Sequence, residues 1–409
     1  MCGIVGIVDE TPVELPVLEA MRDALRHRGP DDAGLWRSPD GCVGLAHRRL
    51  SIIDLSPGGH QPMLDGEADL AVVYNGEIYN CAELRDELRA VGRTFHSTSD
   101  TEVLLAACRQ WGTGAVDRLN GMFAFAAYDD RRRRVLLARD RAGQKPLYYR
   151  QTATGLRFAS ELKALLAEPG CPRHINADAL EEYLAYGYVP GEMCMLDGVG
   201  KLLPGHQAVY DIATRSLDIE AYWSLPVDGP PERADAVELT ERLHELLRDS
   251  VRRRLVADVS VGILLSGGID SSIVTAAAAE VSTAPVKTFT IAFPGHGRHD
   301  ESPYARLVAE HFATDHTELT AEATTVDCLP ELAGQFDEPM ADSSMLPTFM
   351  VSRLIRRHAT VALGGDGGDE LFGGYPFHQL IQRLGWMRCV PRAVRRAVRP
   401  VADRWFSLG

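Results

Sequence analysis

Short apolar runs separated by polar segments dominate the first half of the chain and predict strands. Two or three amphipathic helices are expected there, with Leu15–Arg26, Ala82–Val91 and Thr101–Trp111 as candidates, and Ser99 with Glu102 predicts a capping box for the third. Many strands with few intervening helices indicate an α+β domain built on antiparallel sheets. The predicted strands are Ile4–Val8, Val43–His47, Leu70–Tyr74, Phe123–Tyr128, Val135–Ala138, Leu156–Ala159 and Gln207–Asp211.

The pattern changes after the Pro- and Gly-rich segment Pro226–Pro231, which predicts a linker. Beyond it, helical and strand-like segments alternate, as in a parallel sheet covered by helices on both faces. We therefore expect a first domain at residues 2–213, a linker at 214–235 and an α/β domain at 236–409. The predicted helices are Val237–Arg254, Ser271–Val281, Pro303–Phe312 and Met345–Arg357, and the predicted strands are Val259–Leu265, Val286–Phe293 and Thr360–Leu363.

Composition narrows the function classes. The formal net charge of −14 argues against general nucleic-acid binding. No apolar run reaches the ~20 residues that a membrane-spanning helix needs. The eight cysteines include no C-x-x-C pair, which favours free thiols in a reducing compartment. We expect a cytoplasmic protein that binds neither nucleic acid nor a membrane.

Cys2 is the most informative single residue, because removal of Met1 would make it the N-terminus. A thiol beside a free α-amine is a nucleophile that carries its own general base, since that amine titrates near pH ~7.7–8.0. The alternative is a small residue that packs at the edge of a strand. A catalytic N-terminal cysteine is the prediction that the rest of the sequence favours.

A Gly- and Ser-rich loop, Leu265–Ser272, leaves a predicted buried strand and opens a helix. The helix N-terminus and the serine hydroxyls offer donors to phosphate oxygens. The loop is no Walker A motif, because no Gly-Lys-Ser/Thr follows, and a tight turn is the alternative. Asp270 within the loop favours a nucleotide, since a carboxylate beside phosphate requires a Mg²⁺ between them.

A second glycine-rich loop, Gly364–Glu370, follows the predicted strand Thr360–Leu363. Loops at the carboxyl ends of strands in an open α/β sheet share one crevice, so the two loops can face each other. Asp270 and Asp369 are then candidate Mg²⁺ ligands on opposite walls. A calcium loop is the rival interpretation, but the EF-hand spacing is absent.

Several motifs together resemble the glutamine-hydrolysing asparagine synthetase family. Six resemble its class-II glutamine amidotransferase domain: Cys2–Gly6, Arg49–Ile52, Tyr74–Asn80, Ser99–Glu102, Arg139–Tyr148 and Phe158–Glu161. Three more resemble its synthetase half: Ser266–Ser272, Phe336–Pro339 and Gly364–Tyr375.

The resemblance implies an N-terminal-nucleophile hydrolase domain with stacked antiparallel sheets, followed by an adenine-nucleotide α-hydrolase-like domain with a parallel sheet. It implies that glutamine is hydrolysed in the first domain and that ammonia passes through an internal tunnel. The second domain would join aspartate to AMP from ATP, and ammonia would displace AMP to give asparagine. ATP, Mg²⁺, glutamine and aspartate are the implied ligands, and a homodimer remains an open alternative.

In the first domain, the resemblance implies that Cys2 attacks the glutamine carboxamide to form a thioester. Asn75 and the Gly76 N–H would stabilise the oxyanion. The implied glutamine-binding residues are Arg49 for the α-carboxylate, Asp100 for the α-ammonium, and Asn75, Gly76 and Glu77.

In the second domain, the resemblance implies that Asp366 supports the adenylate step and that Asp270 and Asp369 bind Mg²⁺. The implied ATP-binding residues are Leu265, Ser266, Gly267, Gly268, Asp270, Ser271, Ser272, Ile291, Gly364 and Gly365.

Two departures from the family pattern stand out. Gly364 replaces a serine found in many members, and no lysine follows the second glycine loop. We therefore expect a synthetase domain that is incomplete at its C-terminus. Two alternatives stay open: an amidotransferase of the same plan that acts on another carboxylate in specialised metabolism, and a glutaminase or regulatory module with an incomplete synthetase half.

Overall fold

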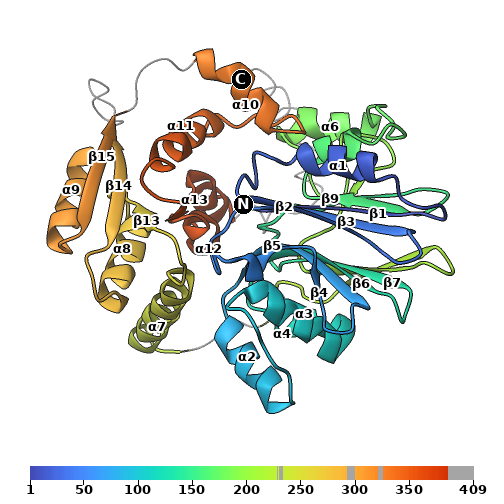
Figure 1. The fold of residues 1–409 in the computed structure, drawn as a ribbon. Helices are drawn as coiled ribbons and strands as arrows, with labels where there is room; N and C mark the ends of the chain where they lie inside the picture. Colours follow the sequence, from blue (N-terminus) through green and yellow to red (C-terminus); the bar gives the residue numbers. More distant parts are fainter. Residues whose placement is uncertain (228, 230–233, 293–299, 321–325, 386–409) are drawn as a thin grey trace. The chain divides into compact units, whose positions relative to one another are not determined.

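The computed structural model describes residues 1–227, 229, 234–292, 300–320 and 326–385. The chain forms two compact units (Figure 1). The first contains Met1–Gly262 and Leu319–Ala362, and the second contains Ile263–Glu318 and the chain from Leu363 onward.

Two antiparallel sheets form the centre of the first unit. In its described part, one six-stranded sheet has the order β10-β8-β9-β1-β3-β2 and the other has the order β12-β11-β7-β6-β5-β4. The strands are β1 Gly3–Val8, β2 Asp32–Arg37, β3 Val43–Arg49, β4 Met63–Leu64, β5 Leu70–Ile78, β6 Gly121–Asp129, β7 Arg134–Arg139, β8 Tyr148–Gln151, β9 Leu156–Ala159, β10 Gly200–Lys201, β11 His206–Asp211 and β12 Ser216–Ala221.

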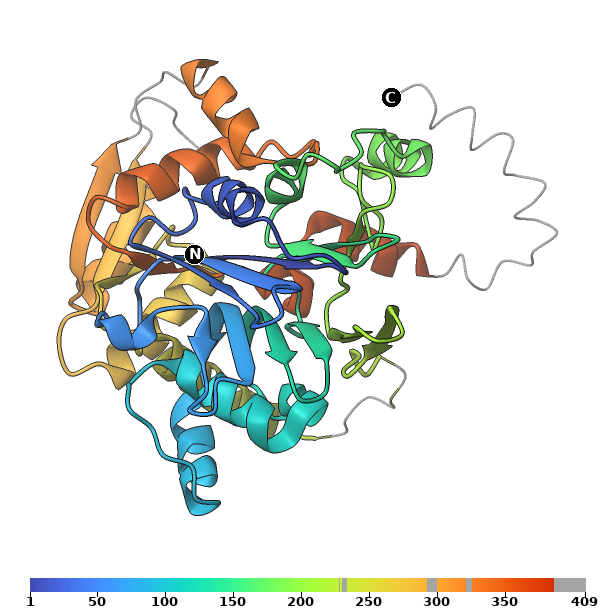
Figure 2. The same ribbon diagram turned by 45° about the vertical axis from the view of Figure 1, so that its right-hand side comes forward.

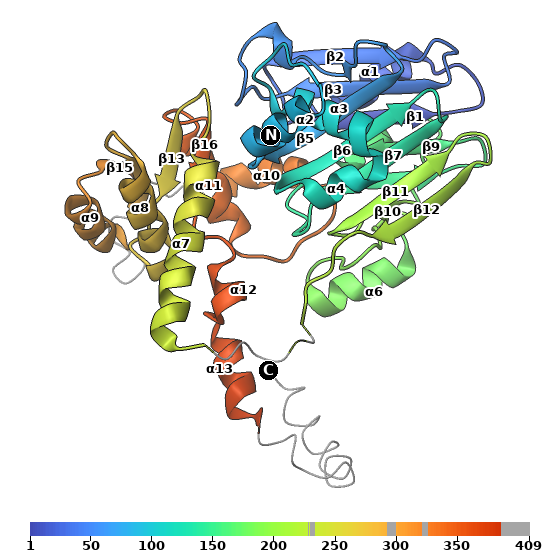
Figure 3. The ribbon, with the colours of Figure 1, turned by 90° about the horizontal axis from the view of Figure 1, so that it is seen from below.

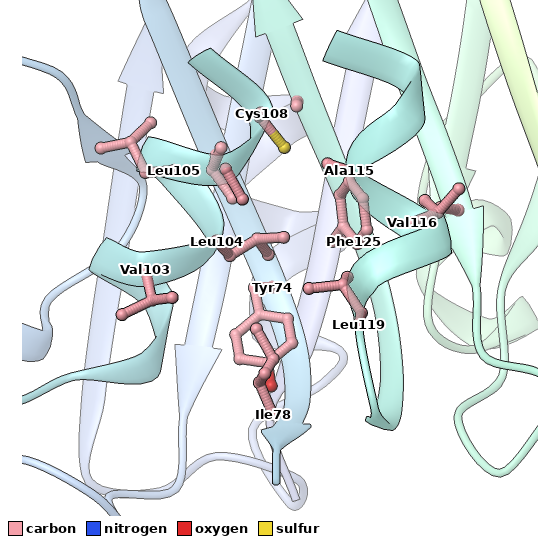
Figure 4. Close-up of a cluster of buried hydrophobic side chains, with 14 of the residues drawn as sticks. Tyr74, Ile78, Val103, Leu104, Leu105, Cys108, Ala115, Val116, Leu119 and Phe125 are labelled. Atoms are coloured by element: carbon pink, nitrogen blue, oxygen red, sulfur yellow. The ribbon is translucent and has the colours of Figure 1, made fainter. Parts of the chain in front are cut away.

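The two sheets stack face to face, with helices on their outer sides (Figures 1 and 2). Residues of both sheets, including Ile4, Val73 and Phe158, share one buried cluster between them. On the outer side of the second sheet, Leu104 and Val116 pack against Phe125 in another cluster (Figure 4). The helices of this unit are α1 Leu15–Asp23, α2 Cys81–Ala90, α3 Asp100–Trp111, α4 Ala115–Arg118, α5 Leu162–Leu166, α6 Ala177–Tyr186, α7 Ala236–Arg254, α10 Leu329–Gln335 and α11 Met345–Ile355.

These layers confirm the predicted α+β domain, and its predicted strands and helices are present with ends shifted by a few residues. The predicted capping box is confirmed for Ser99 and wrong for Glu102. Ser99 caps α3 by accepting a hydrogen bond from the Thr101 N–H. The Glu102 carboxylate accepts from the N–H groups of His96 and Ser97, because the chain before the cap turns back over the helix.

Strand β12 falls inside the range predicted as linker. Ser216–Ala221 pairs along its whole length with β11, so the sheet continues to Ala221 (Figure 3). The strand escapes detection because it lies at the edge of its sheet and is half-buried or exposed throughout. Edge strands of this kind carry polar side chains and lack a clear apolar alternation.

The third sheet has the order β15-β14-β13-β16, and β13 runs parallel to β14. Its strands are β13 Val261–Leu264, β14 Lys287–Ala292, β15 Asp315–Thr320 and β16 Val361–Leu363. Helices α8 and α9 lie beside it (Figures 1 and 3). The helices of the second unit are α8 Ile269–Val281, α9 Ser302–His311, α12 Gly368–Phe372 and α13 Pro376–Arg383. The alternation of helices and strands confirms the predicted α/β part.

Two further expectations concern the cysteines and the membrane. The seven cysteines in the described residues are free thiols. Among the described helices, none combines the length and apolarity that crossing a bilayer would require.

Candidate active site

The first unit holds a cavity of about 320 Å³ at the ends of its central strands. Every residue predicted to act on glutamine lines it: Cys2, Arg49, Asn75, Gly76, Glu77 and Asp100. These residues come from four separate segments of the sequence, so the fold gathers what the motifs only suggested.

Cys2 directly precedes β1, which pairs with β3 and β9. Its Sγ lies 3.6 Å from the Leu50 carbonyl oxygen. Burial raises the pKa of the thiol, so the group rests as a neutral thiol that needs a base. Burial also lowers the pKa of the Met1 α-amine, which lines the same cavity, to about 5. The Met1 α-amine is therefore largely neutral at pH 7.

Asn75 and Gly76 lie in β5, where they pair with Ala124 and Phe123 of β6. Both polar atoms of the Asn75 amide are buried without a hydrogen-bond partner among the described residues. A Cβ on Gly76 would overlap the Met122 carbonyl oxygen, so only glycine fits this close approach. The side-chain amide of Asn75 is thus free to donate to a group inside the cavity.

Arg49 and Asp100 bring opposite charges to the cavity wall. The Arg49 guanidinium donates to the carbonyl oxygens of Ser56 at 3.2 Å and Ile53 at 3.3 Å. Asp100 Oδ2 accepts from the Tyr74 hydroxyl at 2.9 Å and the Ile78 N–H at 3.1 Å, and burial raises its pKa. Among the described residues, neither side chain has an ion-pair partner. Buried charges are normally paired, so this pair of side chains suits a zwitterionic ligand.

Glu77 and Lys145 complete the charges around the cavity. Burial, reinforced by nearby Asp100, raises the pKa of Glu77 to about 7, and burial lowers the pKa of Lys145. Asp140 accepts hydrogen bonds from the N–H groups of Ala142, Gln144 and Lys145 and so shapes the loop that presents this lysine. The motif around Lys145 is recognisable in the sequence, but it did not predict a role for the lysine side chain.

Thr360, Val361 and Ala362 also line the cavity, although they lie far along the sequence from the other wall residues. The Thr360 N–H donates to the Ser260 carbonyl oxygen at 3.1 Å. These residues were predicted only as a strand, and their sequence contains no signal that could have placed them beside Cys2.

In the second unit, Gly267 has a left-handed backbone (φ 83°) and packs against Tyr304 and Ala305 of α9. Ser266 Oγ lies 3.0 Å from Ser271 Oγ and accepts from the Gly268 N–H. The Ser272 hydroxyl donates to the Gly268 carbonyl oxygen. These bonds hold the loop in a compact turn, and the prediction that it binds a nucleotide stays a prediction.

The two glycine-rich loops meet at Asp270. A Cβ built on Gly365 would lie 2.8 Å from Asp270 Cβ, and one built on Gly368 would lie 2.6 Å from its Cγ. Asp270 and Asp369 each stand in the first turn of a helix, α8 and α12. Asp270 thus stands between the two loops, a position where a carboxylate is suited to share a Mg²⁺ with substrate phosphates.

The other predicted nucleotide residues lie in, or directly after, strands of the third sheet. Leu265 is buried and its N–H donates to the Phe289 carbonyl oxygen of β14. Ile291 is half-buried in the same strand. A Cβ on Gly364 would lie 2.5 Å from Asp366 Oδ2, so a serine there would crowd this carboxylate. Asp369 lies against Gly374, which is two residues beyond the end of α12. Among the described residues, no three His, Cys, Asp or Glu side chains group as a complete metal site.

Comparison with known proteins identifies the family. A glutamine amidotransferase domain model matches residues 1–223, and an asparagine synthase model matches residues 242–407. A protein of Methanocaldococcus jannaschii named as a putative glutamine-hydrolyzing asparagine synthetase is 37% identical over 97% of this chain and 79% of its own length. A glutamine-hydrolyzing asparagine synthetase of Bacillus subtilis is 35% identical over 99% of this chain and 68% of its own length.

A more distant relative has a different name. The amidase chry2 of Gibberella zeae is 34% identical over 88% of this chain and 55% of its own length. The two matched domains, in this order and over nearly the whole chain, show that it belongs to the glutamine-hydrolysing asparagine synthetase family.

Proposed function

We propose that the cavity around Cys2 hydrolyses glutamine to glutamate and ammonia. The observation that carries this proposal is the presence of Arg49 and Asp100 in one cavity with a thiol, both buried and neither with an ion-pair partner among the described residues. Arg49 suits the α-carboxylate of an amino acid, and Asp100 with Glu77 suits its α-ammonium. The side-chain carboxamide would then extend toward Cys2.

The chemistry follows from the same geometry. After removal of Met1, the α-amine of Cys2 in its unprotonated form takes the thiol proton, and the sulfur attacks the carboxamide carbon. The Asn75 amide and the Gly76 N–H donate to the oxyanion. The protonated amine returns its proton to the leaving nitrogen, ammonia departs, and water hydrolyses the thioester to glutamate.

For the second unit we propose ATP-dependent amidation of aspartate. The aspartate β-carboxylate attacks the α-phosphorus of ATP, pyrophosphate leaves, and ammonia then displaces AMP to give asparagine. The loop around Ser266–Ser272 would bind the pyrophosphate. Asp366 would support formation of the aspartyl-adenylate. Asp270 and Asp369 would hold the Mg²⁺ that offsets the phosphate charge.

An isotope experiment separates this chemistry from its rivals. Aspartate labelled with ¹⁸O in the β-carboxylate should pass one label to AMP, because the bond between that oxygen and the phosphorus survives when ammonia attacks the carbon. Formation of ADP, or AMP without label, would refute the adenylate. Because one relative is named as an amidase, carboxylates other than aspartate should be tested in the same assay.

Replacing Arg49 with methionine is expected to raise the KM for glutamine about 10- to 100-fold, since a hydrogen bond to a charged group contributes ~1.5–3 kcal/mol. The kcat should change little, because Arg49 holds a part of the substrate that does not react. Steady-state glutamate release measures both constants. Wild type and variant should process glutaminamide, which lacks the α-carboxylate, equally poorly; a normal KM for glutamine in the variant would contradict the assignment.

Asp270→Asn and Asp369→Asn are each expected to weaken Mg-ATP binding by at least about tenfold, because loss of a ligand should cost no less than the loss of an outer partner. Titration calorimetry with ATP, with and without Mg²⁺, measures the effect. Asp315→Asn, at the start of β15, is the matched control. Glutamine hydrolysis should be unaffected in all three, and unchanged Mg-ATP affinity in both loop variants would exclude the paired carboxylates as ligands.

A further inference from the structure

Arg28 joins the backbone of Cys2 to a half-buried acid, Glu161. Its Nε donates to the Cys2 carbonyl oxygen at 2.7 Å, and its Nη1 lies 2.5 Å from Glu161 Oε1. The Arg28 side chain is only 6% exposed. A planar guanidinium held at two points has little freedom, so the position of Glu161 bears on the position of Cys2.

Glu161 contacts three basic side chains. Its carboxylate contacts Arg28, His27 at 2.8 Å and Lys163 at 3.0 Å. Burial opposes its ionisation, but the bonds from His27 and Arg28 outweigh burial and lower the pKa of Glu161 to about 2. The carboxylate is therefore ionised at neutral pH.

Lys163 extends the contacts to a distant part of the sequence. Its Nζ lies 3.2 Å from Asp337 Oδ1 and donates to the Gln335 carbonyl oxygen at 3.1 Å. Its backbone N–H donates to Asp337 Oδ2 at 2.9 Å. Lys163 lies in the glutamine amidotransferase match, whereas Asp337 lies in the asparagine synthase match.

The next residue fixes the same segment a second time. Glu338 accepts hydrogen bonds from Lys201 Nζ at 3.1 Å, from the Tyr148 hydroxyl at 3.2 Å and from the Met195 N–H at 2.8 Å. Two adjacent carboxylates, each bound by a lysine, hold this synthase segment within the first compact unit. The Phe336–Pro339 motif therefore serves as a docking element in this unit.

We propose that Asp337, Lys163, Glu161 and Arg28 form a positioning network through which the docked synthase segment sets the catalytic geometry of Cys2. The inference rests on the proposed glutaminase function. If Asp337 loses its charge, Lys163 turns fully to Glu161, the Glu161–Arg28 bond shifts, and the Cys2 main chain moves with it. Attack geometry is sensitive to such shifts, since a misplacement of ~1 Å can cost ~10²-fold in rate. Glutamine hydrolysis is thereby tied to a correctly placed synthase segment.

The test uses the full chain with the near-isosteric Asp337→Asn. We expect glutaminase kcat to fall about tenfold, a tenth of the loss that a ~1 Å misplacement can cause. The KM for glutamine should stay within about twofold, because the network touches no part of the substrate. Lys163→Met should lower kcat to a similar extent. Lys163→Arg, which keeps the positive charge, should retain much of the wild-type kcat.

A double-mutant cycle and a matched control complete the design. If Asp337 acts through Arg28, the Arg28→Lys/Asp337→Asn double variant should lose no more kcat than Arg28→Lys alone. Arg150→Met breaks a comparably buried ion pair, to Glu168 at 3.2 Å, and should leave kcat unchanged. Equal thermal unfolding of Asp337→Asn and wild type excludes simple destabilisation.

Three outcomes would overturn the network: an unchanged kcat in Asp337→Asn, a loss in the double variant equal to the product of the single losses, or an effect on KM alone. A wild-type chain that fails to hydrolyse glutamine, or a Cys2→Ala variant that still does, would instead reject the glutaminase function and the network with it.

Discussion

Cys2→Ala is expected to reduce glutamine hydrolysis by on the order of 10⁴-fold or more, since removal of a catalytic nucleophile leaves only binding and oxyanion stabilisation. The variant keeps its α-amine after loss of Met1, so a remaining general-base reaction through water would be visible. Glutamate release measures the loss, and mass spectrometry of the intact chain establishes that Met1 is removed.

The control for this experiment is a second thiol. Cys42 is half-buried in the turn between β2 and β3 and does not line the cavity, so Cys42→Ala should hydrolyse glutamine at the wild-type rate. ATP affinity should be the same in both variants. Substantial glutaminase activity in Cys2→Ala would mean that the nucleophile has been misassigned.

Asn75→Ala is expected to lower kcat by about 10²–10³-fold with little change in KM, because an oxyanion donor acts mainly in the transition state. Its amide has no protein partner among the described residues. An unsatisfied buried polar group costs ~1–3 kcal/mol, so the variant should be at least as stable as wild type. A large fall in kcat together with an undiminished Tm would be the signature of a functional rather than a structural amide.

Asn80→Ala provides the comparison for Asn75. The Asn80 amide donates to the Arg118 carbonyl oxygen and accepts from the Asn120 N–H, so its loss should lower stability and leave kcat unchanged. If Asn75→Ala instead lost stability and kept its kcat, the oxyanion role would be excluded and the amide would be part of the core.

Much of the fold could be predicted because local patterns carry it. The near-continuous apolar runs of β1, β3, β5 and β6 reflect strands that are buried on both faces, one against the core between the sheets and the other against the outer clusters. The edge strand β12 and the two-residue strands β4 and β10 could not be predicted, since their pairing depends on neighbours distant in sequence. The predicted capping bond of Glu102 was wrong for the same reason, because its carboxylate accepts from the His96 N–H, which lies outside the helix.

The sequence by itself determined which functional groups the chain carries: a thiol at position 2, an amide and glycine in one strand, and two glycine-rich loops with aspartates. Only the tertiary structure decided that Cys2, Arg49, Asn75 and Asp100 share one cavity, that Lys145 joins them, and that Asp337 reaches back to Lys163. The physical reason is that side-chain type and short-range period are local properties, whereas convergence depends on strand order and sheet stacking. Those depend on the whole core being buried at once.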